Sequence, residues 1–196
     1  MQNDLALYTE YSVIETDITL GDARSISVSN HLNKVDCVIT SPPYPNEKDY
    51  SRTTRLESVI LGFIKTKDDL RKIKKGFIRS NSKNVYRSDE DAQYVCNIES
   101  INALSNEIEQ ERLDLGKTSG FEKLYASVVK LYFGGMAKQL IELKPYLRDG
   151  ASLAYVVGDQ ASYFQIPIRT SKLLGEVAES IGGYTVGRID TFRKRF

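Results

Sequence analysis

The stretch that decides the fold is Val35-Asp36-Cys37-Val38-Ile39-Thr40-Ser41-Pro42-Pro43-Tyr44. Its first half is a short apolar run, rich in β-branched residues, which is typical of a buried parallel strand. Its second half is different in character, because proline fixes φ and removes the backbone donor. The sequence therefore predicts a strand that ends in a stiff, extended turn, whose carbonyl groups remain free to accept hydrogen bonds.

Outward from this stretch, strand and helix patterns alternate. A second apolar run covers residues 151–157, and short strands are expected at 17–20 and 184–192. Apolar residues at three- and four-residue steps predict one helix from about 119, with Ser119 and Glu122 as a capping box, and another over about 167–181. In the first helix, Gly134-Gly135 allow either close packing or a hinge. The alternation predicts an α/β fold with helices on both faces of a sheet.

Composition narrows the functional class. The chain has 196 residues, enough for one domain with a core, and its 27 basic and 26 acidic residues leave a net charge of +1. Two cysteines and one histidine do not supply a four-ligand zinc site or a disulfide framework, so no metal mechanism is expected. The N-terminus carries no basic leader, and no apolar run approaches the ~20 residues of a membrane span. We expect a cytoplasmic protein that does not enter a membrane.

Charge is unevenly distributed in the middle of the chain. Residues 65–87 contain nine bases and two acids, whereas residues 88–111 contain seven acids and no base. Blocks of opposite sign indicate exposed segments that fold against each other or present a charged face to a partner. We interpret residues of about 57–118 as a charged, mostly helical insertion in the α/β domain.

The stretch from Asp36 to Tyr44 resembles the catalytic motif of S-adenosylmethionine-dependent methyltransferases that modify exocyclic amines of DNA bases. Ser41 before Pro-Pro-Tyr resembles the subgroup that acts on N4 of cytosine, whereas enzymes acting on N6 of adenine more often have Asp or Asn there. The longer strings 41–57, 133–136 and 155–162 are similar to one branch of bacterial site-specific DNA methyltransferases, which belong to restriction–modification systems. The similarity extends from about Asp17 to the end of the chain.

This resemblance implies a Rossmann-like sheet and a site at the proline-rich turn. Ser41 and the Pro42 carbonyl would accept hydrogen bonds from an exocyclic amine, which is a poor nucleophile while its lone pair is delocalised into the ring. Pro43 would stiffen the turn, and Tyr44 would stack on a base extruded from the duplex. Ser41, Pro42, Pro43 and Tyr44 are therefore the expected catalytic residues, and methyl transfer would depend on positioning and electrostatics.

The cofactor site is only partly present in this sequence. By the same resemblance, Asp22 and Ala23 lie where the family places an acid near the adenine of S-adenosylmethionine. The glycine-rich turn that normally accompanies it is missing, since no two glycines are separated by a single residue. We therefore expect residues 1–196 to form an incomplete catalytic domain, with a partial methyltransferase sheet. Three explanations stay open: a truncated or interrupted gene, one half of a split enzyme, or an unusual stand-alone protein. In the second case, the expected partner is a second chain that carries the glycine-rich loop.

The expected substrate is double-stranded DNA, because basic residues cluster beside the predicted turn. The residues expected to contact DNA are Arg52, Arg55, Lys72, Lys74, Lys75 and Arg79. Three alternatives remain open. The chain acts on N6 of adenine, it acts on an amide nitrogen of a protein, or it is a non-catalytic DNA-binding remnant or subunit of a modification system.

Overall fold

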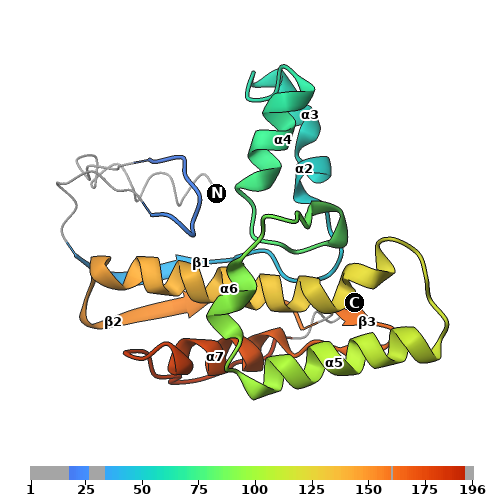
Figure 1. Cartoon of the computed structure of the whole chain (residues 1–196). Helices are drawn as coiled ribbons and strands as arrows, with labels where there is room; N and C mark the ends of the chain where they lie inside the picture. Colours follow the sequence, from blue (N-terminus) through green and yellow to red (C-terminus); the bar gives the residue numbers. More distant parts are fainter. Residues whose placement is uncertain (1–17, 27–33, 160, 193–196) are drawn as a thin grey trace.

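The computed structural model describes residues 18–26, 34–159 and 161–192. The fold is a mixture of helices and strands, in which a small parallel sheet lies against a helical core (Figure 1). The α-helices are α2 (Tyr50–Thr53), α3 (Arg55–Ile60), α4 (Lys67–Lys75), α5 (Glu99–Asp114), α6 (Tyr125–Leu143) and α7 (Thr170–Ser180). The strands are β1 (Val35–Thr40), β2 (Leu147–Tyr155), β3 (Ser162–Tyr163) and β4 (Ile166–Pro167). Short 3-10 turns are η2 (Ser82–Asn84), η3 (Asp91–Val95), η4 (Glu122–Leu124) and η5 (Lys144–Tyr146).

Helix α6 is the centre of the core. Its Tyr132 and Phe133 are fully buried and pack edge to face, with ring centroids 5.0 Å apart. Helix α5, turn η3 and helix α7 surround α6 and contribute Ile101, Val95 and Val177 to the same apolar cluster. Tyr132 and Phe133 are thus core residues, since burying such large apolar side chains is the main stabilising contribution to a core of this size.

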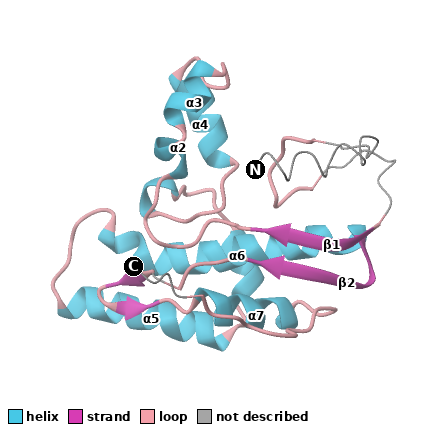
Figure 2. Ribbon diagram, turned by 180° about the vertical axis from the view of Figure 1, so that it is seen from behind, coloured by secondary structure: helices cyan, strands magenta, loops and turns pink. Residues whose placement is uncertain are grey.

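Strands β1 and β2 pair in parallel, as the two apolar runs predicted, and Thr40 lies opposite Tyr155. Side chains alternate between the two faces of a strand, so Leu153 and Tyr155 of β2 face the core. The opposite face carries Ile39 of β1 and Val156 just beyond β2, which are 79% and 57% exposed. Seen from behind, the strands lie on the outside of the molecule, with α6 beyond them (Figure 2).

Three predicted features of the sheet are wrong among the described residues. We expected helices on both faces, but within residues 18–26, 34–159 and 161–192 only the α6 side of β1 and β2 is covered. The strand expected at 184–192 is irregular chain, because Val186 lies against Gly175 of α7 and its N–H donates to Glu179, at 3.3 Å, instead of joining a ladder. Residues 18–20 of the strand expected at 17–20 are exposed and irregular, and Asp17 lies outside the described residues.

The helix expected from about 119 begins later than predicted. Residues 122–124 form η4, and α6 starts at Tyr125 without a side-chain cap, so Ser119 and Glu122 make no capping box. Glu122 instead approaches the ammonium group of Lys117 at 4.0 Å. The helix predicted over 167–181 corresponds to α7, and the strand predicted at 151–157 corresponds to β2, which begins four residues earlier at Leu147.

The segment interpreted as a charged insertion has two parts in the structure. Helices α3 and α4, together with α2 just before the predicted segment, form an arm that projects away from the sheet (Figure 1). Turn η3 and helix α5, by contrast, pack directly on α6. The approach of η3 to α6 requires Gly134, since a Cβ there would lie 1.9 Å from the carbonyl oxygen of Asp91. Of the two roles left open for Gly134-Gly135, close packing is therefore the one that the structure shows.

Candidate functional site

The proline-rich turn begins at the carboxyl ends of both parallel strands, the edge where α/β folds bind their ligands. The N–H of Val156 donates to the carbonyl of Thr40 at 2.9 Å, which carries the pairing of the strands one residue past β2. Ser41 follows at once and is exposed, and its hydroxyl donates to the carbonyl of Val156 at 3.2 Å. The lone pairs of that hydroxyl remain able to accept a hydrogen bond from a ligand.

The two prolines that follow leave acceptors unused. Among the hydrogen bonds formed within the described part of the chain, none ends on the carbonyl oxygen of Pro42 or Pro43. Both residues are half-buried, so their carbonyls are held by a stiff backbone. Within the described residues, the two proline carbonyls at this edge of the sheet are therefore not engaged by the protein itself.

Tyr44 is held in place by a residue that has no side chain. Its half-buried ring lies against Gly158, just beyond β2, and a Cβ on Gly158 would come within 3.0 Å of the ring carbon Cε2. The resulting contact orients the phenol ring next to the strand ends without any hydrogen bond to its hydroxyl in the residues that the structure describes. Asp159, the next residue, accepts from the N–H and hydroxyl of Ser171, both at 2.9 Å, and so ties this strand end to α7.

Glu47 fixes the far end of the turn. Its carboxylate accepts from the N–H of Ser82 at 2.8 Å, from the Ser82 hydroxyl at 2.7 Å, and from the Tyr163 hydroxyl at 3.0 Å. Glu47 also has a φ of 60°, a left-handed conformation that is uncommon for a residue with a side chain. Sequence reasoning missed Glu47, because its donors lie 35 and 116 residues away in the chain.

Beyond Glu47, the surface contains a cavity of about 380 Å³ with aromatic walls. The rings of Tyr125 and Tyr163 stack there with centroids 4.3 Å apart. Burial raises the pKa of the Tyr125 phenol, and the nearby carboxylates of Glu47 and Glu122 raise it further. Burial and Glu47 likewise raise the pKa of Tyr163. Both rings therefore stay neutral, and the cavity presents uncharged aromatic surface beside two carboxylates.

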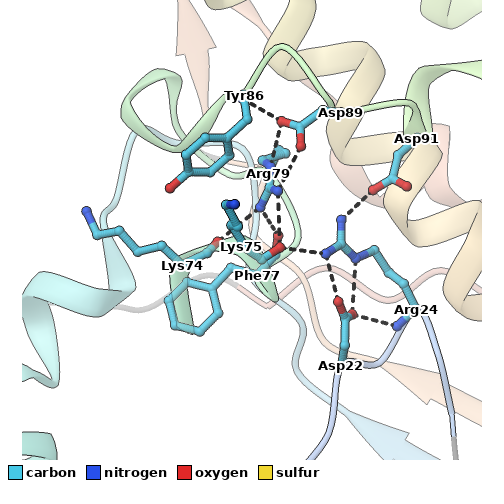
Figure 3. Close-up of polar contacts among 9 residues, drawn as sticks. All are labelled: Asp22, Arg24, Lys74, Lys75, Phe77, Arg79, Tyr86, Asp89 and Asp91. Carbon is cyan, nitrogen blue, oxygen red and sulfur yellow. Dashed lines mark hydrogen bonds and ion pairs between the residues drawn. The ribbon is translucent and has the colours of Figure 1, made fainter. Parts of the chain in front are cut away.

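Asp22, expected near the cofactor, is engaged by a protein cation (Figure 3). Its carboxylate accepts from the backbone N–H of Arg24 at 2.9 Å and from two nitrogens of the Arg24 guanidinium, at 3.1 and 2.8 Å. Arg24 also pairs with the carboxylate of Asp91 at 2.5 Å. Burial alone would raise the pKa of Asp22, but the hydrogen bonds and charge of Arg24 outweigh it, so the pKa lies below its usual value.

The contacts of Asp22 limit how the described residues could bind S-adenosylmethionine. Both carboxylate oxygens of Asp22 are already occupied by Arg24, and Ala23 is an exposed residue in the same turn. The only glycine beside the proline-rich turn, in the described residues, is Gly158, whose open face is filled by the Tyr44 ring. The described residues therefore do not form a cradle for the cofactor by themselves.

The bases expected to contact DNA have different environments. Arg79 is only 3% exposed, and its guanidinium donates to both oxygens of Asp89 and to the carbonyls of Lys74, Lys75 and Phe77 (Figure 3). All five of its N–H groups are used in this way, so Arg79 joins the basic run to the acidic run and has no donor left for a phosphate.

Lys74 is half-buried, and its ammonium group pairs with the carboxylate of Asp49 at 3.1 Å. The other four residues of that prediction are exposed on the arm formed by α2, α3 and α4: Arg52, Arg55, Lys72 and Lys75. The exposed basic residues of the predicted DNA surface thus belong to the arm. Lys74 and Arg79, in contrast, form ion pairs that fix the arm where it joins the body.

The described residues contain neither a metal-ligand cluster nor a membrane-spanning helix. No group of three or more His, Cys, Asp or Glu side chains in residues 18–26, 34–159 and 161–192 is arranged to hold a metal ion. In the same residues, no helix is both long enough and apolar enough to cross a membrane.

Comparison with known proteins identifies relatives for most of the chain. It is 30% identical over 184 residues to the type II methyltransferase M.AvaI of Nostoc sp. strain PCC 7120, and equally to the type II methyltransferase M.AvaI of Anabaena variabilis. The match covers 88% of this chain and 36% of each relative, so the chain spans about a third of the length of the curated relatives it matches. No family model matches the chain, and no solved structure matches it at a significant level. This similarity agrees with the resemblance of the chain to DNA methyltransferases.

Proposed function

We propose that this chain takes part in the S-adenosylmethionine-dependent methylation of DNA, at the exocyclic amine of a base extruded from the duplex. The observation that carries this proposal is the turn from Ser41 to Tyr44, where free acceptors and an aromatic ring adjoin the carboxyl ends of two parallel strands. The similarity to two type II methyltransferases supports the same reading.

In this proposal the turn binds the exocyclic amine, and Tyr44 holds the base by stacking on its ring. The Ser41 hydroxyl oxygen and the Pro42 carbonyl accept hydrogen bonds from the two N–H groups of the amine. These bonds draw the protons out of the ring plane, which reduces the delocalisation of the nitrogen lone pair and directs it toward the methyl donor. Tyr44 stacks on the face of the base, because its own ring is held against Gly158. Glu47 keeps the turn rigid, so the amine meets acceptors that need no rearrangement.

S-adenosylmethionine supplies the methyl group, but the described residues do not hold it, so its binding site belongs to another segment or chain. The bare face of β1 and β2 fits such a partner. Parallel strands are normally covered on both faces, and Ile39 and Val156 are apolar side chains left in solvent. The relatives are also about three times longer than their match to this chain, which leaves ample length for the covering layer.

Cytosine N4 is the favoured acceptor, because a serine stands before Pro-Pro-Tyr in this chain. Adenine N6 is the closest alternative, since the same two acceptors suit any exocyclic amine. A non-catalytic subunit that keeps the turn would bind an extruded base without transferring a methyl group to it. These alternatives differ in product, which makes them separable by experiment.

The test is transfer of tritium from labelled S-adenosylmethionine to double-stranded DNA, by the chain alone and after mixing with the part of the Nostoc relative that this chain does not match. We expect transfer in the mixture only, with N4-methylcytosine as the nucleoside product. Tyr44→Ala and Ser41→Ala should each reduce transfer strongly, while Tyr184→Ala, a half-buried tyrosine outside the turn, should act only through stability. Transfer that survives Tyr44→Ala undiminished would refute the proposal, and N6-methyladenine would select the adenine alternative.

A further inference from the structure

The arm ends in an apolar surface that nothing in the described residues covers. Leu61 and Phe63, in the turn between α3 and α4, are 68% and 61% exposed, and Leu56, Val59 and Ile60 of α3 are also exposed. Solvent-exposed apolar patches of this kind usually mark a binding surface. The arm projects from the body with this turn at its outer end (Figure 1).

The turn is a built structure. Gly62 has a φ of 78°, which lets the chain reverse direction after Leu61, and the N–H of Ile64 donates to the carbonyl of Ser58 at 3.1 Å. Ile64 is buried inside the turn, so one apolar side chain packs inward while its neighbours point out. Thr66 and Asp69 then form a capping box that starts α4. The apolar tip is therefore presented on a rigid support.

Basic side chains surround this tip. Residues 50–76 contain eight bases and three acids, and most of the bases are exposed. The exposed bases are Arg52, Arg55, Lys65, Lys67, Arg71, Lys72 and Lys75. Such a surface attracts a polyanion, whose release of counterions supplies much of the binding free energy.

The position of the arm relates it to the proline-rich turn. The arm starts three residues after Glu47, which anchors that turn, and its base is fixed there by the ion pair between Lys74 and Asp49. A duplex that delivers an extruded base to Tyr44 must run close to this anchor. The arm would then stand against the duplex at the site of extrusion.

We infer that the arm inserts its apolar tip, Leu61 and Phe63, into the base stack of double-stranded DNA, while the basic side chains around the tip bind phosphates. This inference rests on the proposed function for its substrate. Apolar side chains that enter between base steps unstack and kink the duplex, and the gap left by an extruded base is a natural place for them. DNA fits this surface better than an apolar protein partner does, because a protein face would have to bury or neutralise the surrounding excess of positive charge.

The experiment uses the full chain and a fluorescein-labelled duplex of random sequence, with fluorescence anisotropy measured over a range of salt concentrations. The double variant Leu61→Ser/Phe63→Ser should bind about tenfold more weakly at every salt concentration, since apolar contact is lost while the phosphate contacts remain. Lys65→Gln/Lys67→Gln should instead reduce the salt slope by about 1.8, the value for two phosphates. The matched control is Leu113→Ser/Leu115→Ser, two exposed leucines at the end of α5, which should leave binding unchanged.

Insertion itself is measured by energy transfer between dyes on the two ends of the duplex. The wild-type chain should bring the ends together, and Leu61→Ser/Phe63→Ser should abolish this bend. Failure of the wild-type chain to bind or bend DNA would overturn the inference, as would a double variant that binds and bends like the wild type. Loss of a dimer in the double variant, with DNA binding intact, would assign the tip to a second copy instead.

These measurements need no methyl donor, so they separate the two proposals. A bend that depends on Leu61 and Phe63, together with no tritium transfer even in the mixture with the unmatched part of the relative, would support the arm and contradict the proposed function. Methyl transfer that depends on Tyr44 but is accompanied by no bend would do the reverse.

Discussion

Gly158 is the residue on which the orientation of Tyr44 depends. Any side chain there would meet the Tyr44 ring, with Cε2 at 3.0 Å and Cδ2 and Cζ at 3.2 Å from the new Cβ. All three of these atoms belong to the Tyr44 side chain, which can turn more easily than the backbone can shift. The tyrosine ring is therefore the group that would move.

We predict that Gly158→Ala lowers methyl transfer in the complemented assay by about 10- to 100-fold, because displacement of a positioning group by a fraction of an ångström to 1 Å has effects of that order. The melting temperature should change little, since the ring is half-buried at the surface. Gly187→Ala is the control, because a Cβ at Gly187 meets nothing within 4 Å. Equal activity of the two variants would mean that the contact between Tyr44 and Gly158 does not position the base.

At the level of elements, η3 approaches α6 so closely at Gly134 that no side chain fits between them. A Cβ on Gly134 would lie 1.9 Å from the carbonyl oxygen and 2.4 Å from the carbonyl carbon of Asp91, which are backbone atoms. The new methyl group therefore has to push η3 away from α6, and η3 also carries Val95 of the core.

We predict that Gly134→Ala destabilises the fold by about 3 kcal/mol, at the upper end of the range for overpacking in a core. Urea unfolding followed by circular dichroism measures this difference. Gly120→Ala should be close to neutral, because the space around Gly120 is open. Similar unfolding midpoints for both variants would contradict the rigidity assigned to the contact between η3 and α6.

The ion pairs of Arg24 join the segment 18–26 to η3 and make the stability depend on acid. The pKa of Asp22 is lowered in the fold, so the unfolded chain takes up this proton first as the pH falls. The stabilisation is complete above the ordinary aspartate pKa of 3.8 and is lost as the pH falls through the lower value of the folded state.

We therefore expect the free energy of unfolding of the wild type to drop more than that of Asp22→Asn between neutral pH and about pH 3. Asp149→Asn removes an exposed carboxylate that has no ion pair among the described residues, and it should follow the wild-type curve. Parallel curves for the wild type and Asp22→Asn would show that the pairing with Arg24 does not contribute.

The elements that the sequence predicts well are those whose signal is local. The apolar runs of β1 and β2 and the periodicity of α6 and α7 depend on neighbouring residues, and all four elements form. The proline-rich turn is predictable for the same reason, because proline restricts its own backbone. The strand expected at 184–192 fails because a strand needs a partner, and Val186 contacts α7 instead.

The parts of the site that escaped prediction depend on distant pairs. Nothing near Glu47 in the sequence announces its bonds to Ser82 and Tyr163. Arg79 and Lys74 belong to a basic run that reads as one surface, yet Asp89 and Asp49 withdraw them from it. Charge counts along a chain do not reveal which cations have found a partner in the fold.

For the whole molecule, one face of the sheet is left uncovered by the described residues, and it is where the proposed partner segment would bind. The face contains Cys37, an exposed free cysteine of β1, next to the exposed Ile39. The second free cysteine, Cys96, is exposed in the helical part, between η3 and α5. The two thiols therefore report independently on the sheet and on the helical part.

We predict that the unmatched part of the Nostoc relative slows the alkylation of Cys37 by N-ethylmaleimide at least about tenfold, as burial of a thiol blocks access to its thiolate. Cys96 should react at the same rate in both samples, and mass spectrometry of the digested chain measures the two sites separately. If Cys37 remains as reactive as Cys96 in a mixture that methylates DNA, then the complementing segment binds elsewhere.

The pairing of Ser41 with Val156 across 115 residues also bears on how the protein is made. During translation β1 leaves the ribosome long before β2 exists, while α5 and α6 are close in sequence and can associate early. Long-range parallel pairing is slow to form, since the intervening loop must close first. We expect the acceptor turn to become ordered last during biosynthesis, after the helical core has brought the two strands together.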